Sequence, residues 1–340
     1  MSELGSDCEF RDGVGPLRTL GVLTSFKTVQ RVSEKVGGDL ADERHGWKGR
    51  LEAPKHPPKN KSELMVVFGD GCRIRQVAEP PSNRRPDAEI DDGWRECKVG
   101  VVASMLPGTV SKDGSCVPPT ALVQSYLATM DGIELFGQKL RAESERRGLK
   151  GAREVVLVSD AGHGLPEMWA REFPKTEWVV DFYHVASRLA ECAGEVAIPG
   201  KATAAVREKW KGMLYDGKVS GLLRSLRFHA RRHVDRPEEL SALAEGSPGR
   251  ILWTHVFYIE KYRDHMDYPD YRKRGWPIGS GSVESFAKRI GNRMKAASKR
   301  WTRDGAESIA TLIAERASGD GRWNQRWPDH VYDEEVVQLN

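Results

Sequence analysis

The order of short apolar runs along the chain limits its fold more than any other feature. The predicted strands cover residues 64–68, 73–78, 94–105, 154–159 and 177–180. Apolar runs of this length, bounded by polar or glycine-rich segments, predict buried β-strands. Three of them follow one another directly, which suits an antiparallel meander, whereas the later two alternate with helical patterns and suit parallel additions.

Helical spacing fills the gaps between the later strands. Residues 119–148 predict one long amphipathic helix, or two divided at Gly132, and residues 166–173 predict a shorter helix. Near the N-terminus, residues 24–36 predict a helix that Gly37-Gly38 stops. The expected architecture is an α/β mixed sheet with helices on both faces.

The strands do not extend through the whole chain, so the sequence predicts several regions. From residue 185 to about 275 the pattern is all helical, with breaks at proline and glycine. Residues 51–61 are rich in proline and lysine and predict a linker. The predicted division is a partial helical N-terminal region and linker (1–62), a core in two parts (63–184 and 276–318), a helical insertion (185–275) and a tail (319–340).

Charge is concentrated in one segment. The net charge is +4, but residues 271–303 contain ten Lys or Arg and one acid, Glu284, which gives +9 there and leaves −5 for the rest. A basic segment on a mildly acidic body indicates a polyanionic partner such as nucleic acid. The five cysteines lack zinc spacing, and no apolar run reaches the roughly 18 residues of a membrane span. These features predict a cytoplasmic protein without a structural metal.

The basic segment predicts a helix within residues 277–302, with Ser282 as a candidate N-cap. Its apolar residues recur with helical spacing: Val283, Phe286, Ala287, Ile290, Met294 and Ala297. A second face of the same helix carries Glu284, Lys288, Gly291 and Lys295. One carboxylate at the head of a row of cations suits a metal ligand beside a phosphate backbone. A solvated face of an ordinary surface helix fits the same pattern.

Two aspartates follow predicted strands. Asp70 and Asp160 each stand next to glycine or alanine where an apolar strand ends. Because the ends of adjacent central strands lie close together, two carboxylates there can share a divalent cation. Glu284, on a helix packed against the sheet, would complete a site for two Mg²⁺ or Mn²⁺ ions. The structural alternative is that aspartates favour strand-to-loop turns in any case.

Four stretches together resemble bacterial insertion-sequence transposases of the ISKra type. They are Gly69-Asp70-Gly71, residues 94–100 (WRECKVG), residues 180–184 (VDFYH) and residues 277–285 (PIGSGSVES). Lys295 and residues 300–306 extend the last stretch, and the resemblance covers roughly residues 20–318. Such transposases usually begin with a longer N-terminal region, of which this chain has at most the final part.

The resemblance implies a ribonuclease-H-like fold that a helical insertion interrupts before the last acid. It implies a DDE triad of Asp70, Asp160 and Glu284. It also matches Asp181 and His184 to an Asp-x-x-His pair of the related Mutator-like transposases. Both of these residues are therefore candidate catalytic residues.

The predicted function is a DDE transposase that cuts and joins DNA ends with two divalent metal ions. Its partners would be the element ends and the target DNA, bound by a homo-oligomer that assembles on DNA in the cytoplasm and associates with the nucleoid. The candidate DNA-binding residues are Lys288, Arg289, Arg293, Lys295, Lys299, Arg300 and Trp301. Trp301 would stack on an unpaired base or close the helix as a core residue. Two alternatives stay open: a catalytically inactive or domesticated DNA-binding remnant, and a metal-dependent nuclease of the same fold with a host role.

Overall fold

A computed structural model describes most of the chain. The described residues are 1–46, 62–77, 93–112, 115–162, 164–196, 203–235, 240, 243–295 and 299–326. The predicted linker and the end of the predicted tail lie outside them. No helix within these ranges is both long and apolar enough to span a membrane.

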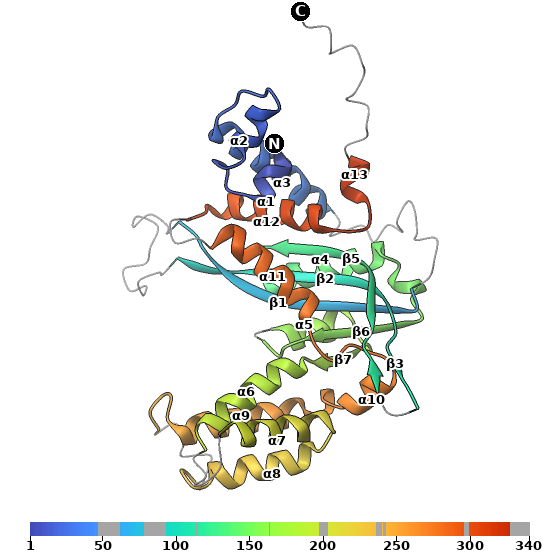
Figure 1. Cartoon of the computed structure of the whole chain (residues 1–340), viewed down its shortest axis with the longest axis vertical. Helices are drawn as coiled ribbons and strands as arrows, with labels where there is room; N and C mark the ends of the chain where they lie inside the picture. The colour runs from blue at the N-terminus through green and yellow to red at the C-terminus, as the bar shows by residue number, and fades with distance from the viewer. Residues whose placement is uncertain are drawn as a thin grey trace, which may run out of the picture.

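A five-stranded mixed sheet with the order β5-β2-β1-β6-β7 forms the centre of the protein (Figure 1). Its strands are β1 (Leu64–Arg75), β2 (Trp94–Leu106), β5 (Thr120–Thr129), β6 (Glu154–Ser159) and β7 (Glu177–Val180). β2 is antiparallel to both β1 and β5, whereas β6 is parallel to β1 and β7 is parallel to β6. This order and these directions are those of a ribonuclease-H-like sheet, so the predicted fold class is confirmed.

Two details of the predicted strands are wrong. The run at 64–68 and the first residues of the run at 73–78 form one strand, β1, which ends at Arg75, because Gly69-Asp70-Gly71 pairs with β2. Residue 78 lies outside the described residues. The third antiparallel strand is β5, where the sequence predicted the first half of a helix. Pairing with β2 along the length of β5 overrides the helical spacing there. Helix α4 (Ile133–Arg146) begins only after Gly132.

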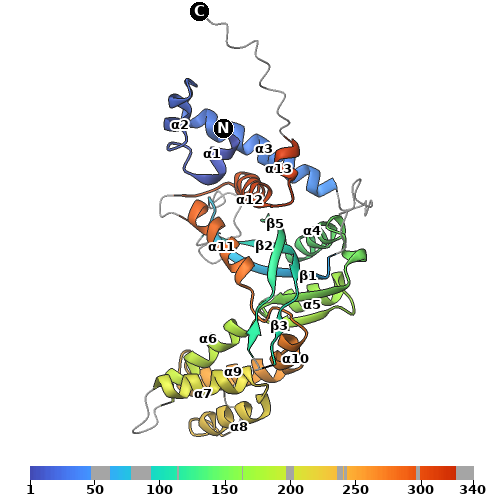
Figure 2. The same ribbon diagram turned by 45° about the vertical axis from the view of Figure 1, so that its right-hand side comes forward.

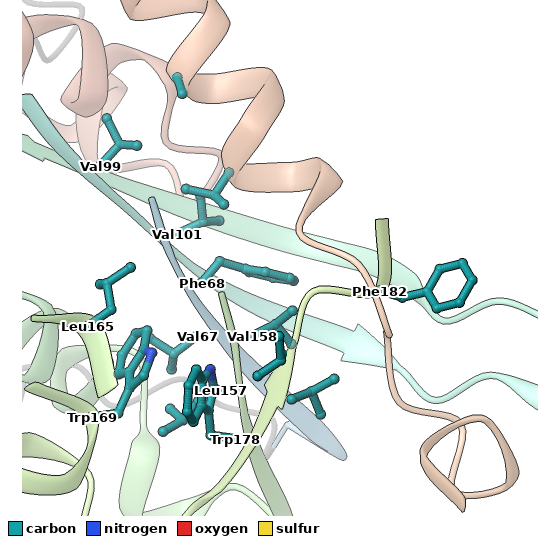
Figure 3. Close-up of a cluster of buried hydrophobic side chains, with 14 of the residues drawn as sticks. Val67, Phe68, Val99, Val101, Leu157, Val158, Leu165, Trp169, Trp178 and Phe182 are labelled. Carbon is teal, nitrogen blue, oxygen red and sulfur yellow. The ribbon is translucent and has the colours of Figure 1, made fainter. Parts of the chain in front are cut away.

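Helices cover both faces of the sheet (Figure 2). α4 and α5 (Leu165–Glu172) lie on one face, and α11 (Gly281–Met294) and α12 (Arg303–Ala317) lie on the other. The packing on the α5 side is close, because a Cβ at Gly69 would lie 2.9 Å from the Trp169 ring. Figure 3 shows Trp169 and Trp178 beside the sheet residues Val67 and Leu157. Both indole N–H groups donate to the Ser159 hydroxyl, at 2.9 and 3.0 Å.

The described residues between β7 and α11 form helices and contribute no strand to the sheet. They are α6 (Phe182–Gly194), α7 (Thr203–Tyr215), α8 (Val219–Ala230), α9 (Pro248–Tyr262) and α10 (Tyr268–Lys273), with a short 3-10 turn at Arg263–His265. This helical block extends beyond the β7 edge of the sheet (Figure 1). Its two ends meet, because the Phe182 N–H donates to the Ile278 carbonyl at 2.8 Å. The chain therefore enters and leaves the block at one point.

Three helices precede the sheet: α1 (Ser2–Asp7), α2 (Val14–Thr19) and α3 (Phe26–Gly46). The predicted stop at Gly37-Gly38 is wrong, because α3 continues through both residues to Gly46. A Cβ at Gly37 would lie 2.1 Å from the Ser308 carbonyl oxygen, so glycine here allows α3 to approach α12 closely. The short helix α13 (Arg322–Arg326) follows α12.

A buried ion cluster joins α4 to α12. The Lys139 ammonium lies 2.9 Å from an Asp131 carboxylate oxygen and 3.1 Å from a Glu307 carboxylate oxygen, and the Lys139 side chain is only 2% exposed. The Thr129 hydroxyl donates to Glu307 at 2.8 Å. Lys139 is thus shared by two largely buried acids, and the Arg303 guanidinium, 2.9 Å from Asp131, is a second cation of the cluster.

Candidate active site

The pairing of β1 with β6 places two predicted acids side by side. The last paired residues are Gly69 and Ser159, and Asp70 and Asp160 follow them. Because side chains alternate between the faces of a sheet, and the Gly69 position faces α5, Asp70 faces the opposite side. That side is covered by α11, whose first turn carries Glu284. The topology therefore brings all three predicted acids to the carboxyl end of β6, beside the middle of β1.

The acids act on one another electrostatically. The pKa of Asp70 is raised to about 6, mainly by burial and then by the negative charges of Asp160, Glu284 and Asp181. The Gly71 N–H donates to the Asp70 carboxylate at 2.7 Å and opposes this rise. A divalent cation would relieve the repulsion among these carboxylates.

Asp181 has a different position from the other acids. It is 0% exposed and caps the N-terminus of α6, where its Oδ1 accepts from the His184 backbone N–H at 2.9 Å. Its Oδ2 accepts from the Ser280 backbone N–H at 2.6 Å and from the Ser280 hydroxyl. Asp181 therefore fixes the turn before α11, and its predicted contact with the reacting groups stays a prediction.

Ser280 connects that buried aspartate to the third acid. Its hydroxyl also lies 2.9 Å from Oε1 of Glu284. Ser280 is the N-cap of α11, so the predicted N-cap, Ser282, is wrong; the Ser282 hydroxyl instead accepts from Gln124 at 2.8 Å. No local sequence pattern indicates this role of Ser280, because Asp181 and Ser280 are 99 positions apart.

The second aspartate has neighbours from the helical block. Nε2 of His184 lies 3.6 Å from Oδ2 of Asp160, and the catalytic role of His184 stays a prediction. The Ala161 N–H donates to the Tyr258 hydroxyl at 3.3 Å, and the Arg188 guanidinium lies 4.1 Å from the centre of the Tyr258 ring. Burial raises the pKa of Tyr258 to about 12. Sequence reasoning missed Tyr258, because it lies in an ordinary helical stripe of α9.

The three acids are of the chemical type that binds a metal ion, but their side chains are not arranged to hold one. Carboxylate oxygens are the ligands that Mg²⁺ and Mn²⁺ prefer, and Asp70, Asp160 and Glu284 offer them beside one another in the fold. Among the described residues, however, no group of three or more His, Cys, Asp or Glu side chains is arranged to hold a metal ion. The site for two ions formed by these three acids therefore stays a prediction.

The candidate DNA-binding residues divide into three groups. Lys288, Lys295 and Arg300 are exposed, and Arg289 and Lys299 pair with acids near the N-terminus. Arg293 and Trp301 are buried, at 6% and 7% exposure. Helix α11 ends at Met294, and Trp301 returns to the end of β1, where its backbone N–H donates to Arg75 at 3.1 Å. The predicted contact of Trp301 with an unpaired base is therefore corrected: its ring closes the core.

An acidic N-terminal segment faces the basic side of α11 across a groove of about 610 Å³. Arg289 lies 3.3 Å from Asp7, and Lys299 lies 2.9 Å from Glu9. The Arg293 Nε–H donates to the Gly5 carbonyl at 3.0 Å. Within the described ranges, Lys288 and Lys295 form no ion pair. The basic side of α11 is thus partly neutralised by the chain itself.

A second basic surface lies on α8, outside the predicted set. Four arginines surround the exposed ring of Phe228: Arg224, Arg227, Arg231 and Arg232. Their spacing follows one face of a helix, which the sequence could have revealed. They add positive charge to the helical block.

We expect replacement of Asp70 by Asn to stabilise the metal-free protein at neutral pH. The folded-state pKa of about 6 lies above the ordinary value of 3.8, so protonation favours folding. That contribution is complete below pH 3.8 and is lost as the pH rises through about 6. The Asn variant should equal wild type near pH 4 and exceed it by about 1–3 kcal/mol at pH 7.5.

Urea unfolding in EDTA at several pH values measures this difference. Asp216→Asn is the matched control, because Asp216 is 50% exposed in an ion pair with Lys218. Its difference from wild type should stay small at every pH. A difference for Asp70→Asn that does not grow between pH 4 and pH 7.5 contradicts the raised pKa.

Comparison with protein-family models finds no matching family, and comparison with curated proteins finds no matching protein. Among solved structures, the chain is similar to the strand transfer complex of the Drosophila P element transposase, with a TM-score of 0.29 and 14% sequence identity. The similarity covers 96% of this chain and 80% of that chain. A likeness at this level carries no argument about function.

Proposed function

We propose that this protein is a DDE transposase that cuts and joins DNA strands with divalent metal ions. The observation that supports it most is the position of Asp70, Asp160 and Glu284 near the carboxyl end of β6, where burial and the charges of Asp160 and Glu284 raise the pKa of Asp70. A cluster of repelling carboxylates is unfavourable unless a cation compensates it. The basic side of α11 continues from Glu284 and suits a phosphate backbone.

Asp70, Asp160 and Glu284 would hold the cations. Two bound Mg²⁺ or Mn²⁺ ions would supply activation of water or of a 3′-hydroxyl and stabilisation of the leaving oxygen. Asp181, through Ser280, fixes the first turn of α11 and with it Glu284. His184, whose Nε2 lies 3.6 Å from Oδ2 of Asp160, would contact Asp160 or a phosphate oxygen. The homo-oligomer would form on the DNA ends.

A cleavage assay tests the proposal. Purified protein is incubated with the DNA that flanks its gene on both sides, in Mg²⁺, in Mn²⁺ and in EDTA. We expect strand breaks at defined positions with either metal and none in EDTA. Random breaks without preference for the flanking DNA would favour a nuclease with a host role instead.

The second candidate is a DNA-binding remnant without catalysis. The pairing of Arg289 and Lys299 with N-terminal acids, and the open spacing of the three carboxylates, are the observations in its favour. Binding to the flanking DNA without any cleavage in Mg²⁺ or Mn²⁺ would support the remnant and contradict the transposase.

We expect the double variant Lys288→Ala with Lys295→Ala to weaken DNA binding without preference for sequence. Each exposed lysine can contact one phosphate, so the slope of log K against log salt should fall in magnitude by up to about 2. Binding measured between low and moderate salt gives this slope. An unchanged slope would mean that this side of α11 is merely solvated.

The matched variant removes the acids instead of the bases. Asp7→Asn with Glu9→Gln frees Arg289 and Lys299 and should strengthen DNA binding at low salt. The gain should be modest and should disappear at high salt, because exposed ion pairs contribute about 0–1 kcal/mol and are screened. Weaker binding by this variant would show that the N-terminal segment contributes to the DNA-binding surface of α11 and does not compete with DNA for it.

A further inference from the structure

A groove of about 500 Å³ opens beside Glu284, between the core and the helical block. Its walls include Pro118, Tyr183, Tyr215, Arg272, Trp276 and Glu284. The volume lies within the range of about 300–1,000 Å³ that is typical of small-molecule sites. Because Glu284 lines the groove, whatever enters it lies next to the proposed catalytic acids.

Tyr183 is the most exposed aromatic ring of this groove. It is 61% exposed, although its neighbour Phe182 is buried. The ring lies against the backbone at Gly279, since a Cβ there would be 2.6 Å from two of its atoms. The lack of a side chain at Gly279 thus lets the Tyr183 ring pack against the backbone, while Tyr183 itself remains exposed to solvent. An exposed aromatic ring held in this way provides a flat surface for stacking.

Arg272 and Tyr215 form a second flat surface that lines the same groove. The Arg272 guanidinium lies 3.6 Å from the centre of the Tyr215 ring, and its Nη2 donates to the Tyr215 carbonyl at 2.9 Å. Tyr215 is 37% exposed. Aromatic rings and guanidinium planes together bind nucleobases, whereas an aliphatic ligand would gain little from the fixed charge of Arg272.

We propose that this groove binds one unpaired base of the cleaved DNA strand, next to the scissile phosphate, by stacking on Tyr183. The inference rests on the proposed function, because Glu284 brings a phosphate to this place only if it acts in strand cleavage. Stacking requires no particular base, since every base has a flat aromatic face. Because the stacked base is unpaired, the duplex must open by at least one base pair at the cut.

The test uses duplexes of the flanking DNA in which one unpaired thymidine is moved along the strand. A matched series replaces that thymidine with an abasic site, and binding is measured by fluorescence anisotropy in EDTA. At one position, we expect wild type to bind the duplex with the unpaired thymidine about 5- to 150-fold more tightly than the duplex with the abasic site. Tyr183→Ala should lose this preference, and Tyr183→Phe should keep it.

The control is Phe257→Ala, which removes a 42% exposed ring outside the groove lining and should keep the wild-type preference. If wild type shows no preference at any position, or if Tyr183→Ala weakens both DNA series equally, the inference is overturned while DNA binding stands. If wild type binds neither series, the proposed function fails together with the inference.

Discussion

Glu284→Gln is expected to abolish cleavage while DNA binding stays the same or becomes stronger. The change removes the charge of a proposed metal ligand and leaves the cations of α11 in place. Loss of several kcal/mol of metal-assisted stabilisation corresponds to a fall in cleavage rate of about 100- to 1,000-fold or more. Affinity should not fall, because a carboxylate near a phosphate repels it.

The comparison is a cleavage time course in Mg²⁺ beside a binding titration in EDTA. Glu208→Gln on α7 is the matched control, since Glu208 is 60% exposed and lies outside the site. Thermal unfolding confirms that each variant is folded. Cleavage by Glu284→Gln within a few-fold of wild type would remove Glu284 from the triad.

Lys139→Met should cause the largest loss of stability. It leaves the carboxylate of Glu307, at 13% side-chain exposure, without its cation, whereas Asp131, at 6%, keeps the Arg303 guanidinium at 2.9 Å. Removing one partner of a buried ion pair costs about 3–5 kcal/mol, because the remaining charge is uncompensated. Urea unfolding of variant and wild type measures this loss.

Two further variants make this prediction specific. Lys218→Met removes a 65% exposed lysine from an ion pair and should change stability by less than about 1 kcal/mol. Adding Asp131→Asn and Glu307→Gln to Lys139→Met should recover most of the loss, because no unpaired charge then stays buried. If the triple variant is as unstable as Lys139→Met alone, packing and not charge explains the effect.

The sequence predicted the buried strands better than the exposed one. Residues 154–159 and 177–180 are short and apolar, and they form β6 and β7 with the predicted bounds. β5 begins with exposed residues and is rich in residues that suit a helix, so only its pairing with β2 identifies it. The strand end expected at Asp70 is wrong for the same reason, since pairing with β2 continues β1 through Gly69-Asp70-Gly71.

In the candidate site too, the sequence indicates residues with a local pattern but not residues that only long-range contacts identify. Asp70, Asp160 and Glu284 could be found because each has a local context, a strand end or the start of a helix. Ser280 and Tyr258 could not, because their contacts join residues 99 and 97 positions apart and leave no local pattern. Helical periodicity predicted the buried stripe of α11, but not the acidic segment that faces its cations.

The meeting of the two ends of the helical block also bears on how the protein folds. Glu284 reaches the other two acids only after the chain has closed a loop of about a hundred residues, and loop closure is entropically unfavourable. Helices held by local contacts form quickly, so the block should fold early and shorten the effective distance between Asp181 and Ser280. We therefore expect the sheet and the block to form before the Asp181–Ser280 contact, which makes assembly of the site a late step of folding.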